Sequence, residues 1–173
     1  MRKLFLFLLV LPLATFASSK ESKTDKATKA VAEVKAFQKI CELVKSKQFQ
    51  VEIDKVYPQD GFDMTRFNPQ GKITVTDSIA KGCLPYFGRA YSLSYGEGGG
   101  IEFEDQMQKV KTQMIKKRKK KSIVFGFSVH GNKDYYQISI EVMANGQCNV
   151  QLYSNNRSSI VYGGMVTPLG EKS

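Results

Sequence analysis

The residues best suited to ligand binding lie together in one aromatic and glycine-rich segment, 84–100 (LPYFGRAYSLSYGEGGG). Tyr86 and Tyr91 have flat faces that can stack on a planar ring, and Arg89 between them can donate paired hydrogen bonds to a carboxylate or phosphate. Arg157, in the later sequence Ser-Asn-Asn-Arg, supplies a second guanidinium. We therefore predict a ligand-binding site made of Tyr86, Arg89, Tyr91 and Arg157.

A structural interpretation of the same segment competes with this one. Aromatic residues also fill strand positions that face a core, and glycines also form loops without binding anything. The glycine run lacks the lysine and the following helix of a phosphate-binding loop, and the strand pattern Ile101–Glu104 follows it instead. The sequence leaves the ligand site and the fold element open as alternatives.

Lysines form the second notable group, in the run Lys116–Lys121 (KKRKKK). Clustered cations can bind acidic polymers or lipid phosphates, since they release counterions when they meet phosphate. The run also stands just before the strand pattern that begins at Ile123, where lysines commonly fill a hairpin connection or protect a sheet edge. We predict a solvated connection with weak anion binding at most. Nucleic acid is not an expected partner, because no binding motif accompanies the charge.

The pattern of histidine, cysteine and acidic residues favours neither an enzyme nor a metal site. His130 is the only histidine, and the cysteines have no paired-ligand spacing; they are Cys41, Cys83 and Cys148. Cysteine–histidine catalysis would require Cys83 or Cys148 to lie beside His130 in space. Glu102 and Glu104 share one face of a strand that the pattern predicts to be wet. We expect no catalytic residue, no metal and no cofactor.

The first 17 residues have the three parts of a secretion signal. Arg2 and Lys3 precede the apolar run 4–13, and small residues stand at Thr15 and Ala17. This run is shorter than the roughly 20 residues that a membrane-spanning helix needs. We expect cleavage after Ala17 and export to the periplasm or the medium, without a remaining membrane anchor; a permanent anchor is the alternative.

The remaining sequence predicts one helix followed by strands. Apolar residues recur every three or four positions over residues 27–47, as in an amphipathic helix whose stripe contains Ala30, Val34, Phe37, Cys41 and Val44. Beyond residue 47 the period becomes two, for example in Phe49, Val51 and Ile53. The last third predicts four strands, at 122–130, 135–143, 147–153 and 158–166, and Asn145-Gly146 between two of them is typical of a type I′ hairpin turn.

These elements predict an α+β fold, in which one N-terminal amphipathic helix packs on a curved antiparallel β-sheet or a partly closed β-barrel. Without helices between strands, a parallel nucleotide-binding sheet is not expected. The predicted organisation is a signal peptide (1–17), a flexible polar leader (18–26), a single domain (27–166) and a C-terminal tail (167–173). Three cysteines are not a disulfide framework, so the hydrophobic core must supply the stability.

Three segments resemble a known family: Tyr86-Phe87-Gly88-Arg89-Ala90-Tyr91, Ser154-Asn155-Asn156-Arg157 and Phe49-Gln50-Val51-Glu52-Ile53-Asp54. In order and content they are similar to domain of unknown function 4251, a family of exported proteins of Gram-negative gut bacteria. The resemblance runs from about Val44 to Val166. It implies an exported location and a small domain, and it carries over no catalytic residue, since the family has no assigned activity.

Three functions are compatible with this sequence. The first is a non-catalytic exported domain that binds a ligand or partner through the segment from Tyr86 to Gly100. The second is a structural or envelope-assembly protein without a small-molecule site, which docks another protein through a sheet edge or face. The third, a hydrolase, would require a cavity that joins His130 to a cysteine or to a carboxylate pair.

Overall fold

The computed structural model describes residues 23–59, 63–67, 69–91, 99–117, 120–132 and 134–170. The predicted signal peptide, residues 92–98 of the glycine-rich segment and residues 118–119 of the lysine run lie outside these ranges. The described elements are, in chain order, α1 (Lys23–Ser46), β1 (Gln48–Pro58), the short 3-10 helix η1 (Thr65–Phe67), β2 (Gly71–Thr76), β3 (Ile79–Leu84), β4 (Ile101–Gln106), β5 (Gln108–Lys117), β6 (Lys120–His130), β7 (Tyr135–Met143), β8 (Gln147–Ser154) and β9 (Ile160–Pro168).

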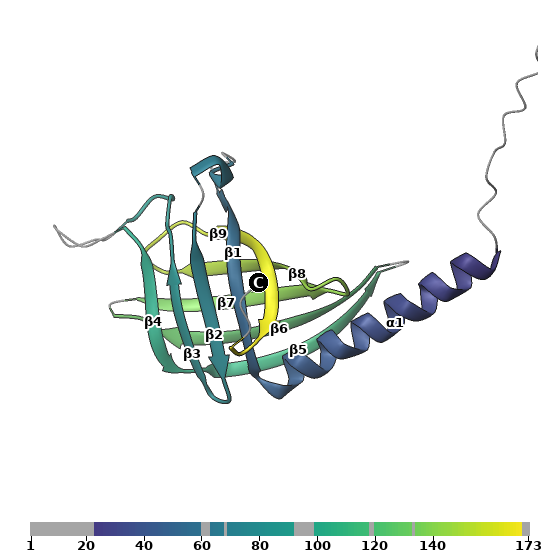
Figure 1. Cartoon of the computed structure of the whole chain (residues 1–173). Helices are drawn as coiled ribbons and strands as arrows, with labels where there is room; N and C mark the ends of the chain where they lie inside the picture. Colours follow the sequence, from purple (N-terminus) through teal and green to yellow (C-terminus); the bar gives the residue numbers. More distant parts are fainter. Residues whose placement is uncertain are drawn as a thin grey trace, which may run out of the picture.

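The strands form one antiparallel sheet in the order β4-β3-β2-β1-β9-β8-β7-β6-β5. Figure 1 shows that this sheet is strongly curled, with the first four strands facing β6 and β7 across the interior. The α+β class and the curved antiparallel sheet predicted from the sequence are therefore confirmed. The four strands of the last third are β6 to β9, each paired with the next.

The two outer strands of the sheet are neighbours in the chain, separated only by Met107. Met107 donates its backbone N–H to the carbonyl of Ser78, and Lys109 adopts a left-handed φ of 52°. An isolated bridge pairs Phe103 of β4 with Gly131, just past the end of β6. The sheet thus curls back on itself, and the bent β4–β5 segment brings its two edges together as a partly closed barrel.

The interior of the barrel is filled by every second residue of the strands, the apolar ones that the period-two pattern predicts to face inward. Phe49 and Val51 are fully buried and Ile53 is 4% exposed, so the inward face of β1 is the one that the sequence predicts. The Phe49 and Phe125 rings meet edge to face, with centroids 5.5 Å apart. Burying this alternating face supplies the main driving force for the fold, because each large apolar side chain contributes roughly 1.5–3 kcal/mol.

Helix α1 packs on the sheet through its C-terminal half. Phe37, Cys41 and Val44 are buried, while Val31 and Val34, one to two turns earlier, are exposed. Helical contacts reach β1, β6 and β7, and Figure 1 shows the N-terminal half projecting beyond the sheet. Lys47 ends the helix in a left-handed conformation, with a φ of 55°.

Three details differ from the sequence predictions. The helix begins at Lys23, within the predicted leader 18–26, because no glycine or proline interrupts residues 23–46. Strand β9 runs to Pro168, into the predicted tail. Between β7 and β8, Gly146 has a positive φ of 82° but Asn145 does not, so this turn is not of type I′, which needs two positive φ angles. Among the described helices, none is long and apolar enough to span a membrane.

Candidate functional site

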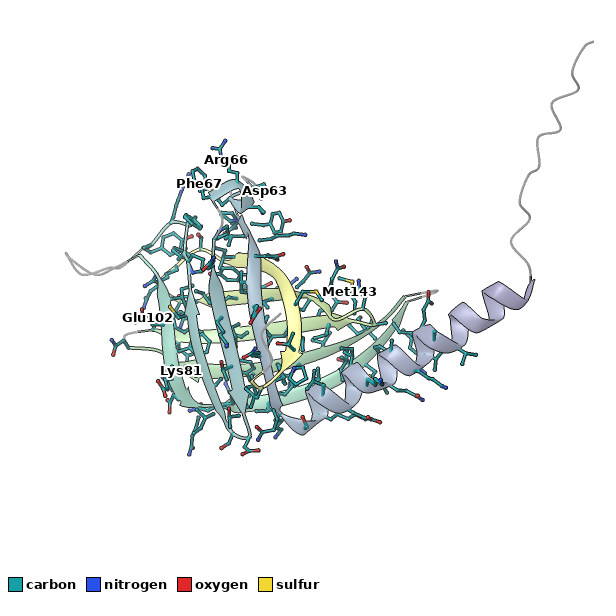
Figure 2. All side chains as sticks on the ribbon, viewed as in Figure 1. Asp63, Arg66, Phe67, Lys81, Glu102 and Met143 are labelled. Carbon is teal, nitrogen blue, oxygen red and sulfur yellow. The ribbon has the colours of Figure 1, made fainter. Side chains whose placement is uncertain are left out.

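The predicted site residues lie at one end of the barrel. Because neighbouring strands are antiparallel, β1, β3, β6 and β8 all finish at the same end, where β4, β7 and β9 begin. Tyr86, Arg89 and Tyr91 follow β3, and Arg157 follows β8. We call this end of the barrel the upper rim; η1, with Arg66 and Phe67, stands on it in Figure 2.

Arg157 is a buried connector on the upper rim. Its side chain is 9% exposed, and its Nη1 donates to the carbonyl oxygens of Gly99 and Gly100 at 3.3 and 3.0 Å. Its Nε lies 3.9 Å from Oδ2 of Asp134. These contacts fix the start of β4 to the β8–β9 connection, so the guanidinium already has protein partners on most sides.

Asp134 is the anionic partner in this cluster, and its side chain is 7% exposed. Its carboxylate also accepts from the backbone N–H of Tyr135 at 2.8 Å, from the hydroxyl of Ser154 and from the amide of Asn156 at 3.4 Å. A buried carboxylate needs such donors, since burial without them would cost several kcal/mol. The cluster therefore joins the β6–β7 connection to the β8–β9 connection.

Tyr86 also contacts the guanidinium of Arg157. The guanidinium carbon of Arg157 is 5.1 Å from the centroid of the Tyr86 ring, a cation–π contact. The Tyr86 hydroxyl lies 2.7 Å from the carbonyl of Arg89 and 2.9 Å from Oγ of Ser158. Burial raises the pKa of Tyr86, and its hydrogen bond to Ser158 partly opposes that change.

The backbone of the 88–91 segment is fixed to the β8–β9 connection. Arg89 donates its N–H to Oγ of Ser158 at 3.0 Å and accepts from the N–H of Ser158 at 2.9 Å. Tyr91 donates to the carbonyl of Asn156 at 2.8 Å. A Cβ at Gly88 would lie 2.5 Å from the Tyr86 hydroxyl, so only glycine fits this turn without displacing Tyr86.

The four predicted site residues therefore divide into two pairs. Tyr86 and Arg157 are in contact and partly or fully buried, where they hold the rim together. Arg89 and Tyr91 have exposed side chains, and Tyr91 is 69% exposed. Asp134 and Ser158, which complete the cluster, are absent from the sequence prediction because no local pattern marks either residue.

Exposed aromatic side chains gather on the upper rim. Among the large apolar residues that are exposed in the described ranges, every aromatic one lies at this end of the barrel, whereas the aliphatic ones lie elsewhere. The aromatic members are Tyr57, Phe67, Phe87, Tyr91 and Tyr153. Arg66 adds a cation, with its guanidinium carbon 4.8 Å from the Phe67 ring centroid. We call these five aromatic residues, with Arg66 and Arg89, the aromatic rim.

Cys83 and His130 line one shallow depression of about 600 Å³ on the outer surface, together with Glu102 and Glu104. The predicted wet face of Glu102 and Glu104 is confirmed, and Glu104 accepts from Lys81 at 2.7 Å. Strand β4 lies between Cys83 and the end of β6, so two strand spacings, or about 10 Å, separate the backbones at Cys83 and His130. The depression thus places His130 near Cys83 and near the pair Glu102 and Glu104, as the hydrolase alternative requires, but among the residues that the structure describes no hydrogen bond joins His130 to any of these side chains. In the described ranges, no three metal-ligating side chains form a metal-binding group.

The comparisons with known proteins concern the family and the fold. The family model described as "Domain of unknown function (DUF4251)" matches residues 32–166. A crystal structure of a DUF4251 family protein from Bacteroides eggerthii DSM 20697 is similar in fold, with a TM-score of 0.55 and 21% sequence identity over 85% of this chain and 94% of that chain. No curated protein matches the chain. The chain belongs to the DUF4251 family of domains of unknown function, as the resemblance of its sequence motifs implied.

Proposed function

We propose that this protein is an exported, non-catalytic domain that binds a ligand through the aromatic rim. The observation that carries the proposal is the segregation of exposed aromatic residues to one end of the barrel. Exposed aromatic side chains cost solubility, so their collection beside two arginines favours a binding role. The N-terminal sequence, with its basic start, short apolar run and small residues before Ser18, supports export.

In this proposal the two pairs of predicted residues have different roles. Tyr91 and Arg89 contact the ligand, because their side chains are exposed on a backbone that Ser158 and Asn156 hold in place. Tyr86 and Arg157 position that segment, and they contact at most one edge of the ligand. The ligand would carry a flat face for stacking on an aromatic ring and a carboxylate or phosphate for a guanidinium.

A thermal-shift and calorimetric comparison tests this proposal. The probes are an anionic sugar acid such as galacturonate, a sugar phosphate and the matched neutral sugars. We expect the anionic probes to raise the Tm of the wild type and to lose this effect in Arg89→Ala and Tyr91→Ala, with little change in the Tm without ligand, because both side chains are exposed.

Two results would reject the rim as a binding site. One is a wild-type Tm that no probe changes, together with alanine variants destabilised by several kcal/mol, as in a purely structural segment. The other is binding that persists unchanged in Arg89→Ala and Tyr91→Ala. Export is tested separately, by mass spectrometry of the protein recovered outside the cytoplasm, where the proposal requires an N-terminus at Ser18.

A further inference from the structure

The positive charge of this protein is concentrated in two neighbouring parts of the fold, the β5–β6 hairpin and helix α1. Residues 107–130, which contain β5 and β6, carry eight lysines and arginines and not one acidic residue. Helix α1 carries six lysines and three acidic residues. Together these two parts carry a net charge of +11, against +10 for the whole chain, so the rest of the chain is close to neutral.

The end of the β5–β6 hairpin places like charges opposite one another. In the strand register Lys116 pairs with Lys121, and the next pair is Lys117 with Lys120. The Lys116 and Lys121 side chains are both exposed. Directly opposed like charges destabilise a strand pair, so this arrangement works against hairpin stability unless an anion lies nearby.

Exposed aliphatic side chains accompany these lysines. Met114 is 50% exposed and lies opposite Ile123, on the same face of the hairpin as Lys116. The Met114 sulfur is 4.0 Å from the Cys41 sulfur, which places α1 beside this face. One to two turns beyond Phe37, Val34 and Val31 of α1 are 41% and 56% exposed. Figure 1 shows the hairpin end and the N-terminal half of α1 pointing in the same direction, away from the barrel.

We propose that this projecting surface, made of Val31, Val34, Met114, Lys116 and Lys121, binds the surface of an anionic phospholipid bilayer. The lysines meet the headgroup phosphates, and the aliphatic side chains enter the interface between headgroups and acyl chains. This membrane contact is at the opposite end of β6 from the aromatic rim. The turn of the β5–β6 hairpin precedes the first residue of β6, whereas the rim lies at the last residues of β6. When the protein is bound to the membrane, the aromatic rim would therefore face the solvent.

The aliphatic residues favour a bilayer over a soluble polyanion. A polysaccharide or nucleic acid would need only the cations, and stacking aromatic side chains would be expected near the lysines. Here the exposed large apolar side chains of the hairpin end and of the projecting half of α1 are methionine and valine, which suit an acyl-chain boundary.

Vesicle co-sedimentation tests this inference on the full protein, purified as it is recovered in soluble form. Vesicles of phosphatidylcholine are compared with vesicles that contain about one quarter phosphatidylglycerol, at low and high salt. The wild type is expected to bind the anionic vesicles, more weakly at high salt. Lys116→Gln with Lys121→Gln should weaken that binding about tenfold or more, since each lysine near an anionic surface adds roughly fivefold.

Two matched variants make the result specific. Lys55→Gln with Lys72→Gln removes the same charge from exposed lysines on β1 and β2, and it should bind anionic vesicles like the wild type apart from the general loss of charge. Val31→Ser with Val34→Ser keeps every charge and should also weaken vesicle binding, while its retention on heparin beads stays unchanged. The Lys116/Lys121 variant should be at least as heat-stable as the wild type, because it relieves the opposed charges.

The inference is overturned if the wild type does not prefer anionic vesicles. It is also overturned if the Lys116/Lys121 variant and the Lys55/Lys72 variant bind anionic vesicles equally. It is also overturned in favour of a soluble polyanion if the valine variant binds vesicles as tightly as the wild type while heparin retains both. None of these outcomes depends on a ligand at the aromatic rim, because Arg89 and Tyr91 are unchanged in every variant.

Discussion

The guanidinium of Arg157 contacts both the ring of Tyr86, whose centroid is 5.1 Å from the central guanidinium carbon, and the carboxylate of Asp134, whose Oδ2 is 3.9 Å from Nε. The sequence predicts Tyr86 and Arg157 as ligand contacts, and the structure shows them in contact with each other. Their mutual contact makes them part of the framework that holds the exposed segment of Arg89 and Tyr91.

Replacing Arg157 should destabilise the fold strongly. Arg157→Ala would leave the buried Asp134 without its cation and the carbonyls of Gly99 and Gly100 without a donor, so we expect a loss of about 3 kcal/mol or more. Arg157→Lys should recover only part of this, because an ammonium cannot form the planar fork. Urea denaturation measures both. Arg66→Ala, at an exposed arginine, should lose about 0.5 kcal/mol or less; equal losses at the two positions would contradict the buried role of Arg157.

A methyl group at Gly164 should not be tolerated. Gly164 pairs with Ile53 beside the register shift of β1 and β9, and a Cβ there would collide with the backbone carbonyl of Glu52. We expect Gly164→Ala to cost about 2–3 kcal/mol, because backbone atoms must move. Gly126→Ala is the control, since the nearest atoms to its Cβ would be 3.9 Å away. Equal denaturation midpoints for these two variants would rule out the close β1–β9 approach.

The three cysteines should differ sharply in reactivity. All three are free thiols, Cys83 is exposed, and Cys41 and Cys148 are buried. Burial raises the pKa of Cys148 to about 12 and raises that of Cys41 as well, so neither forms much thiolate at neutral pH. A chromogenic disulfide reagent at pH 8 should titrate one thiol per folded chain and three after unfolding. Cys83→Ala should abolish the native titration, and a fast-reacting thiol in that variant would be inconsistent with the buried core.

Alkaline pH should weaken the fold. Burial raises the pKa of Cys148 from 9.0 to about 12, and burial also raises the pKa of Tyr86, Tyr136 and Tyr162. The folded state therefore keeps protons that the unfolded chain releases above about pH 9, and stability is complete below that pH and falls as the pH approaches 12. Cys148 alone can contribute up to about 4 kcal/mol to this loss.

Urea midpoints between pH 8 and pH 11 measure this change. Cys148→Ala removes one of the buried groups, so its stability should decline less steeply over the same interval. A wild-type midpoint that stays constant from pH 8 to pH 11, or variant and wild-type slopes that coincide, would contradict the burial of this thiol.

Local periodicity was sufficient to predict much of this fold. The alternation of Phe49, Val51 and Ile53 specifies which face of β1 is buried, because successive side chains of a strand point to opposite faces. The same reasoning located β6 to β9, and the three- and four-residue spacing located the helix. The spacing did not predict that the two halves of the helix differ in burial. It indicates which face of the helix is apolar, but not how much of that face the sheet covers. Val34 fits the stripe of Phe37 and Cys41 but is exposed.

The sequence by itself determined the class of fold, the inward faces of the strands and the segments in which aromatic and cationic residues occur, because these properties depend on residues a few positions apart. Only the tertiary structure decided how β4 and β5 close the sheet and that Arg157 is buried against Tyr86 while Arg89 is exposed. Arg157 bonds Gly99 and Gly100, more than fifty residues earlier, and Tyr86 reaches Ser158 across seventy-two residues. Such contacts form only when distant strands reach a common register, and no local spacing encodes that register.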